Sequence, residues 1–147
     1  MKQKYLKRLV ASYVRDKDVP YSENLKSPED VARSFGYLRT RDREEFVSLH
    51  LDKGNNPLCW DRVSVGTLSE AIVHPREVFK TALLSNASAV IFIHNHPSGR
   101  GEPSPEDRQL TKKLQEAAKL LQIQVMDHLI IHGEEGQFFS FREHGLL

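Results

Sequence analysis

The sequence predicts an α/β fold in which a mixed β-sheet is flanked by helices. Short runs rich in β-branched and aromatic residues alternate with longer stretches whose apolar residues recur every three or four positions. Two of the longer stretches begin with the same serine–proline–acid signal for a helix start. With 147 residues, 39% of them hydrophobic, the chain is long enough for one domain with a buried core. Strands separated by helices in this way form a sheet with helices on its faces.

Residues 1–26 form the first predicted unit, a basic amphipathic helix followed by a connector. Residues 1–17 carry six basic side chains and one acid. Apolar residues at helical spacing run between them: Tyr5, Leu6, Leu9, Val10, Tyr13 and Val14. We expect this helix to pack on its own domain or on a partner. Contact with phosphates, and membrane-surface or organelle targeting, are the alternatives.

Residues 27–147 form the second predicted unit, which begins with a helix and a β-hairpin. The segment Ser27-Pro28-Glu29-Asp30 opens a helix that we expect to reach about residue 38. Residues 46–51 and 58–65 alternate in hydrophobicity as strands do, and the glycine, asparagine and proline residues between them favour a turn.

The remainder of this unit alternates helices with strands. Proline and acidic residues mark helix starts, β-branched runs mark strands, and a glycine-rich turn precedes the last strand. The expected elements are a helix at 75–85, a strand at 89–93, a helix at 104–122, a strand at 123–131 and a strand at 137–141.

Two histidines follow directly after the apolar run 89–93. Alternate side chains of a strand point to the same face, so His94 and His96 should project together, with Cα atoms roughly 6.5–7 Å apart. Asn95 should point away from them. Pro97 lacks a backbone N–H, so the strand should end there.

An aspartate lies at the predicted start of the helix that follows. Ser104 is the expected N-cap, and Asp107 falls at the third helical position, where its carboxylate lies close to the cap. The polar loop between the two elements would fold Asp107 back toward the histidines. Two imidazoles and a carboxylate suit a catalytic zinc with one position open for water. The alternative is that Asp107 serves only the helix cap and dipole.

The pattern His94-x-His96-Pro97 followed by Ser104-x-x-Asp107 resembles the JAMM metalloprotease motif of JAB/MPN domains. The surrounding sequence is similar to the RadC family over about residues 27–147. The matching segments are Ile72 to Phe79, His94 to Gly99, Pro103 to Asp107, and Asp127-His128. The resemblance implies the cytidine-deaminase-like architecture of JAB domains.

The resemblance also implies a site and an activity. It makes His94, His96 and Asp107 the ligands of one Zn²⁺ ion per chain. It gives Ser104 the task of polarising the scissile carbonyl or holding the oxyanion, beside its task as N-cap. A cap uses the serine oxygen as an acceptor and catalysis uses its proton, so both can hold. The implied enzyme is a zinc-dependent metallohydrolase of the metallopeptidase or isopeptidase type.

JAMM enzymes need an upstream glutamate as the base that takes a proton from the attacking water. The candidates are Glu44 and Glu45, just before the strand at 46–51. Glu44 stands in the Glu-x-Phe pattern usual in RadC relatives, whereas an ungapped register against eukaryotic JAMM strands favours Glu45. The two side chains point to opposite faces, so only one can serve. We favour Glu44 and keep Glu45 as the alternative.

Composition restricts the remaining choices. The net charge of +1 gives no global attraction to nucleic acid, and no stretch approaches the ~20 apolar residues of a membrane span. A single cysteine, Cys59, and the lack of a secretory signal favour a cytoplasmic protein. Among the other histidines, the pair Asp127-His128 is the best candidate to support a ligand histidine from behind.

These features favour hydrolysis of a peptide or isopeptide bond in a peptide or protein substrate. One alternative is a DNA-processing or DNA-repair-associated protein that acts on nucleic acid, although the chain shows neither a second metal set nor a dense carboxylate cluster. Full-length RadC proteins carry an upstream helix-hairpin-helix region for which we expect no room in this sequence. The other alternative is a non-enzymatic metal-binding interaction module. The oligomeric state stays open.

Overall fold

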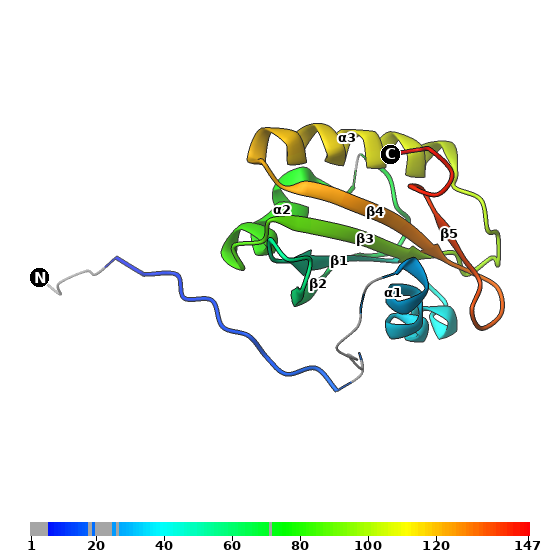
Figure 1. The fold of residues 1–147 in the computed structure, drawn as a ribbon, viewed down its shortest axis with the longest axis horizontal. Coiled ribbons are helices and arrows are strands. Elements are labelled where there is room, and N and C mark those ends of the chain that lie inside the picture. The colour runs from blue at the N-terminus through cyan, green and yellow to red at the C-terminus, as the bar shows by residue number, and fades with distance from the viewer. Residues whose placement is uncertain (1–5, 18, 20–24, 26, 71) are drawn as a thin grey trace, which may run out of the picture.

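The fold is described from a computed structural model, in which residues 6–17, 19, 25, 27–70 and 72–147 are placed. A five-stranded sheet with strand order β2-β1-β3-β4-β5 forms its centre (Figure 1). The elements are α1 (Pro28–Ser34), the 3₁₀ helix η1 (Gly36–Thr40), β1 (Glu45–Leu51), β2 (Pro57–Val65), α2 (Pro75–Leu84), β3 (Ala89–Asn95), α3 (Pro105–Leu121), β4 (Gln124–Ile131) and β5 (Phe138–Ser140).

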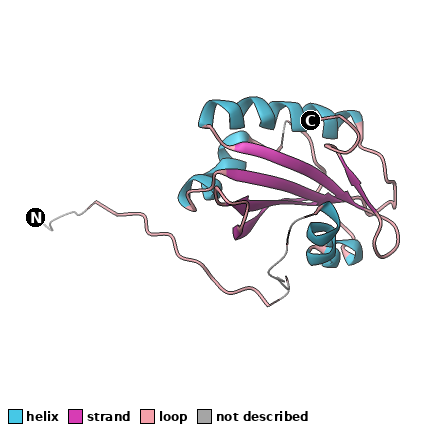
Figure 2. Ribbon diagram, viewed as in Figure 1, coloured by secondary structure: helices cyan, strands magenta, loops and turns pink. Residues whose placement is uncertain are grey.

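The sheet is mixed, as predicted. Strand β1 pairs antiparallel with both β2 and β3, and β4 pairs antiparallel with β5. Strands β3 and β4 are parallel, with α3 as the crossover between them. A parallel pair needs such a crossover, so the helix between these two strands explains the one parallel pairing. The α/β class with a mixed sheet and flanking helices is therefore confirmed (Figure 2).

Helices cover both faces of the sheet. In Figure 1, α3 lies above the sheet and α1 lies below it. Phe46 and Phe92 belong to the core cluster that includes residues of α2 and α3, whereas Val47 and Ile93 belong to the cluster that includes residues of α1. Every residue of β1 is buried because both of its faces are covered. We call these the α3 face and the α1 face.

The predicted N-terminal helix is wrong for residues 6–17. They adopt no regular secondary structure, and their apolar residues are exposed, with Leu6 and Val14 at 101% and 88%. An isolated helix of this length is marginal in water and needs a surface to bury its apolar stripe, which periodicity alone cannot supply. The rest of the expected helix and connector, at residues 1–5, 18, 20–24 and 26, lies outside the described residues.

The helix expected at 27–38 is divided into α1 and η1. Ser27 is its N-cap, accepting a hydrogen bond from the backbone N–H of Asp30 at 3.2 Å, as predicted. The α-helix ends at Ser34, and its C-cap, Phe35, is buried on the α1 face. The 3₁₀ helix starts at Gly36, a poor helix former. No helix in the described part of the chain has the length and apolar content needed to cross a membrane.

Candidate metal centre

The three predicted metal ligands come together where β3 ends and α3 begins. His94 Nε2 lies 3.0 Å from His96 Nε2 and 3.4 Å from Asp107 Oδ1. His96 Nε2 lies 3.1 Å from Asp107 Oδ2. His94 and Asp107 are buried, and His96 is partly buried. Among the described residues these three form a group that could hold a metal ion.

Backbone pairing beyond the end of β3 places His96 beside His94. The His96 N–H donates to the carbonyl of Ile131 at 3.0 Å, which continues the parallel pairing with β4 past Asn95. The alternation of side chains therefore holds for one more residue, and both imidazoles point to the α3 face. His96 Nδ1 donates to the carbonyl of Arg100 at 2.9 Å. That bond turns His96 Nε2 toward the other two ligands.

The capping box of α3 orients the carboxylate. Asp107 N–H donates to Ser104 Oγ at 3.0 Å, and Ser104 N–H donates to Asp107 Oδ2 at 2.8 Å. The reciprocal bonds fix the Asp107 side chain with its oxygens toward His94 and His96. Asp107 therefore belongs both to the helix cap and to the candidate metal group. The two roles, which the sequence analysis treated as alternatives, are compatible.

The electrostatics of this group favour a positive charge among the three ligands. Burial acts to raise the pKa of Asp107, but its contacts with His94 and His96 outweigh it and hold that pKa far below its ordinary value. Burial acts to lower the pKa of His96, but its bonds to Asp107 and Arg100 outweigh it and raise that pKa above its ordinary value. Asp107 is therefore a carboxylate, and it stabilises a cation beside it.

Glu44 lies at the same site. It lines a cavity of about 540 Å³ together with His96 and Ser104. Its Oε2 accepts a hydrogen bond from the backbone N–H of Leu68 at 3.0 Å, so the loop after β2 holds the carboxylate. Phe46, two residues on, pairs with His94 in the sheet and stacks on its ring, which places Glu44 on the α3 face.

Glu45 points the other way. Its carboxylate is buried and forms ion pairs with Arg41 Nε at 3.3 Å and Arg62 Nε at 3.4 Å. It shares the α1 face with Val47, so the sheet lies between Glu45 and the histidines. The structure thus brings Glu44 to the candidate ligands and does not bring Glu45 there.

Asn95 points away from the histidines, as expected, and reaches the backbone on either side of Glu44. Its Oδ1 accepts from the Glu45 N–H at 2.7 Å, and its Nδ2 donates to the Arg43 carbonyl at 3.0 Å. Asn95 therefore attaches the segment that carries Glu44 to the strand that carries His94. No local pattern in the sequence predicts this contact, because it depends on the register of β1 against β3.

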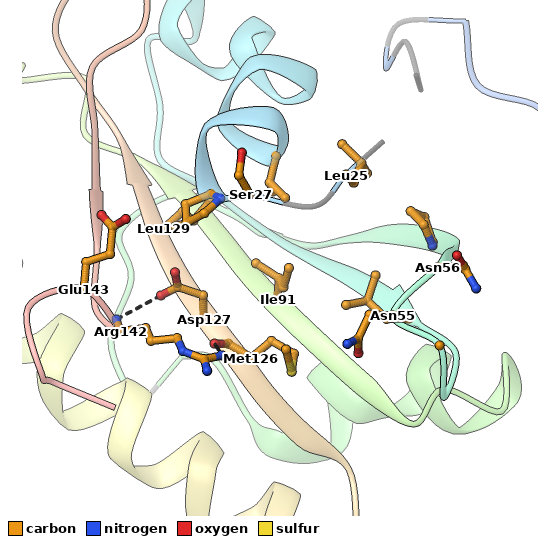
Figure 3. Close-up of a pocket in the computed structure, with 15 residues that line it drawn as sticks. Leu25, Ser27, Asn55, Asn56, Ile91, Met126, Asp127, Leu129, Arg142 and Glu143 are labelled. Atoms are coloured by element: carbon orange, nitrogen blue, oxygen red, sulfur yellow. Dashed lines mark hydrogen bonds between the residues drawn. The ribbon is translucent and has the colours of Figure 1, made fainter. Parts of the chain in front are cut away.

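Of the pair Asp127-His128, His128 is the residue that contacts the ring of His94. His94 Nδ1 lies 2.8 Å from His128 Nε2, and His128 Nδ1 lies 2.6 Å from Thr111 Oγ1. Asp127 faces the opposite side of the sheet, where it lines a cavity of about 720 Å³ and accepts from the Arg142 N–H (Figure 3). The expectation for Asp127 was therefore wrong, because neighbouring residues of β4 point to opposite faces. Thr111 was not foreseen, although its position four residues after Asp107 on one helix was a usable signal.

Comparison with known proteins agrees with this arrangement. The family model described as "RadC-like JAB domain" matches residues 25–146. A UPF0758 protein of Pelodictyon phaeoclathratiforme is 44% identical over 145 residues, which cover 95% of this chain and 64% of that protein. UPF0758 proteins of Methanosarcina acetivorans and Rubrobacter xylanophilus are 46% and 48% identical over 122 and 127 residues, covering 82% and 84% of this chain.

The names of these relatives assign no activity to them. The chain spans 52% to 64% of the length of these three relatives, so it corresponds to one part of each. The matched segment contains every element of the sheet and all three candidate ligands. The chain belongs to the RadC family and comprises its RadC-like JAB domain.

Proposed function

We propose that this domain is a zinc-dependent metallohydrolase of the JAMM type that cleaves a peptide or isopeptide bond. The observation that carries the proposal is the convergence of two imidazoles and one ionised carboxylate, with a further carboxylate, Glu44, in the adjoining cavity. Ligand atoms about 2.0–2.1 Å from a tetrahedral zinc are about 3.3–3.4 Å apart. The observed separations of 3.0, 3.1 and 3.4 Å are of this size, although the last two end on different oxygens of Asp107. One ligand atom from each of the three residues lies within 4.8 Å of the others.

His94, His96 and Asp107 would hold the ion, and two nitrogens with one oxygen favour zinc among the divalent ions. When bound, zinc supplies a Lewis acid that makes water a nucleophile near neutral pH and polarises a carbonyl. Three protein ligands leave room for water and substrate on the side of the cavity that His96, Glu44 and Ser104 line.

Glu44 is the proposed base. One of its oxygens is held by the Leu68 N–H, which leaves the other to accept a proton from the attacking water and pass it to the leaving amine. Ser104 is the proposed donor to the oxyanion. Its Oγ accepts from the Asp107 N–H, a bond that uses a lone pair and not the hydroxyl proton.

The choice of bond follows from the number of metal groups. Nucleases that cleave phosphodiesters commonly use two ions or a dense carboxylate cluster. Among the described residues there is a single group of three metal-binding side chains, and its carboxylate count is one. This supports acyl chemistry on a peptide or protein substrate over the alternative of a nucleic acid substrate.

Elemental mass spectrometry of the purified protein tests the metal. We expect one zinc per chain in the wild type and none in His96→Ala. His74→Ala is the matched control, because His74 lies at the start of α2 and belongs to no described metal group, so it should keep the zinc. Absence of zinc from the wild type, even after reconstitution, would refute the proposal.

Peptide, isopeptide and nucleic acid panels then test the reaction. Turnover of a peptide or isopeptide that disappears in His96→Ala supports the proposed function. Cleavage of nucleic acid that likewise disappears in His96→Ala would support the DNA-processing alternative instead. A zinc-bound protein that cleaves none of them would be an interaction module.

A further inference from the structure

We infer that Thr111 and His128 are positioning residues that hold His94 in the tautomer able to bind a metal through Nε2 and link its ring to Asp107. The inference rests on the proposed metal site and adds two residues to it. Three contacts carry it, from the Asp107 carbonyl to Thr111, from Thr111 to His128, and from His128 to His94. All four residues are buried, so water does not replace any of these bonds.

The first contact fixes the proton of Thr111. Thr111 Oγ1 lies 2.7 Å from the carbonyl oxygen of Asp107, one turn earlier on α3. A carbonyl oxygen only accepts, so the hydroxyl proton must lie between these two atoms. Thr111 Oγ1 can then only accept from its other neighbour, His128 Nδ1, at 2.6 Å. His128 therefore carries a proton on Nδ1.

The surroundings of His128 fix its other nitrogen. The ring has no exposed surface, and it is stacked on Phe141 with ring centroids 4.6 Å apart. The rings of Phe46 and Phe92 meet it edge-on. Because Nδ1 carries the proton directed at Thr111, Nε2 is the ring nitrogen with a lone pair, and His94 Nδ1 is the atom that faces it.

The last contact then determines His94. His128 Nε2 lies 2.8 Å from His94 Nδ1, and since it only accepts, the proton sits on His94 Nδ1. With Nδ1 as the protonated nitrogen, Nε2 is the nitrogen through which His94 would bind a metal, and it lies toward His96 and Asp107. Metal ligation requires this deprotonated nitrogen.

The contacts form a closed path between two ligands. It starts on the backbone of Asp107, passes through Thr111 and His128, and ends on the ring of His94, which itself lies 3.4 Å from the Asp107 carboxylate. A shift of α3 against the sheet would disturb His94 and Asp107 together. Without the hydroxyl of Thr111, His128 loses the acceptor that selects its tautomer, and His94 loses its fixed orientation.

Zinc affinity, measured by competition with a chromophoric chelator, tests the path. Thr111→Val keeps the shape and removes the hydroxyl, and we expect zinc binding to weaken by about 10- to 100-fold. Thr111→Ser restores the hydroxyl and should bind zinc within about threefold of the wild type. Thr81→Val is the matched control, because Thr81 also donates from a helix, to Asp61 Oδ2 at 2.9 Å, but takes no part in the path.

A nuclear magnetic resonance readout needs neither zinc nor substrate. Two-bond ¹⁵N–¹H correlations of the histidine rings report which nitrogen bears the proton, and in the metal-free wild type we expect His128 to be the Nδ1–H tautomer. In Thr111→Val we expect this signal to shift or to split between tautomers, whereas Thr111→Ser should keep it. A wild-type His128 protonated on Nε2, or unchanged zinc affinity in Thr111→Val, would overturn the inference. Failure of the wild type to bind zinc would refute the metal site. The tautomer of His128 would still show whether Thr111 and His128 orient His94 as inferred.

Discussion

Replacement of Asn95 by leucine should destabilise the domain although it leaves every candidate ligand in place. Leucine branches at Cγ as asparagine does, but it is larger and cannot hydrogen-bond. The change leaves the buried Glu45 N–H without an acceptor and the partly buried Arg43 carbonyl without its amide donor. A buried donor without a partner costs about 1–3 kcal/mol, and the more accessible carbonyl adds about 1 kcal/mol. The expected loss is therefore about 2–4 kcal/mol in the free energy of unfolding.

Urea denaturation followed by circular dichroism measures this loss. Domains of this size unfold with about 5–15 kcal/mol, so the variant stays folded without denaturant and its midpoint can be determined. Ser48→Ala is the control, because Ser48 is also buried but its hydroxyl has no hydrogen-bond partner among the described residues. That variant should lie within about 0.5 kcal/mol of the wild type.

The same two variants test what Asn95 does for Glu44. Because Asn95 holds the backbone on both sides of Glu44, its loss should lower turnover, while zinc stays at one per chain. Ser48→Ala should change neither quantity. If Asn95→Leu unfolds with the wild-type free energy, the two bonds contribute nothing net, and our reasoning about this contact is refuted.

Three further predictions concern other parts of the domain. Glu44→Gln should lower turnover by about 10²- to 10⁴-fold with the zinc retained, whereas Glu45→Gln should leave turnover near the wild-type value; steady-state kinetics with metal analysis would contradict this if the two effects were reversed. Burial lowers the pKa of His50 to about 4, so folded His50 resists a proton that the unfolded chain takes up near pH 6.5. This contribution to stability is present above pH 6.5 and is lost as the pH falls through 6.5 toward about 4, by about 3 kcal/mol, and urea titrations should show a weaker decline in His50→Gln. Phe92→Ala should cost about 3–5 kcal/mol, because the buried ring packs on Phe46 and Phe79, and a loss below about 1 kcal/mol by denaturation would contradict that packing.

The parts of the fold that sequence predicted well are those with local signals. Ser104 and Pro105 predict the start of α3, and the helix begins at Pro105 with Ser104 as its N-cap. Strand β3 shows as a short apolar run, and it extends only two residues beyond the predicted end at 93. Such signals depend on neighbours in the chain, so periodicity and capping rules can find them without knowledge of the tertiary fold.

The N-terminal segment shows the limit of the same rules. Its apolar residues have helical spacing, but within residues 6–17 they stay exposed, and this segment forms no helix. An apolar stripe allows a helix to pack on a surface, but most of the helix's stability comes from that packing. Residues 105–121 have both the pattern and the sheet beneath it, and they are helical.

The alternation of side chains along a strand shows that only one of Glu44 and Glu45 can lie at the site, but it does not show which one. Period-two geometry shows that the two carboxylates lie on opposite faces, yet it does not say which helices cover which face. That depends on the antiparallel pairing of Phe46 with His94, a contact between residues far apart in the sequence. His128 depends in the same way on the parallel register of β3 and β4, which contains an irregularity between Val90 and Ile91.

The candidate metal ligands could be predicted because this site is assembled where two elements end. A strand end and a helix start leave backbone groups unpaired, and residues placed there carry the recognisable signals of those ends. Asp107 is found by its capping pattern, and the same capping bonds hold its carboxylate toward the histidines. Sequence reasoning named His128 only as one of a pair with Asp127, and it did not foresee the roles of Thr111 and Asn95, which depend on contacts between elements. In this domain, therefore, the groups proposed to meet the metal are encoded locally, whereas the contacts that His128 and Asn95 make around them are encoded by the register of the sheet.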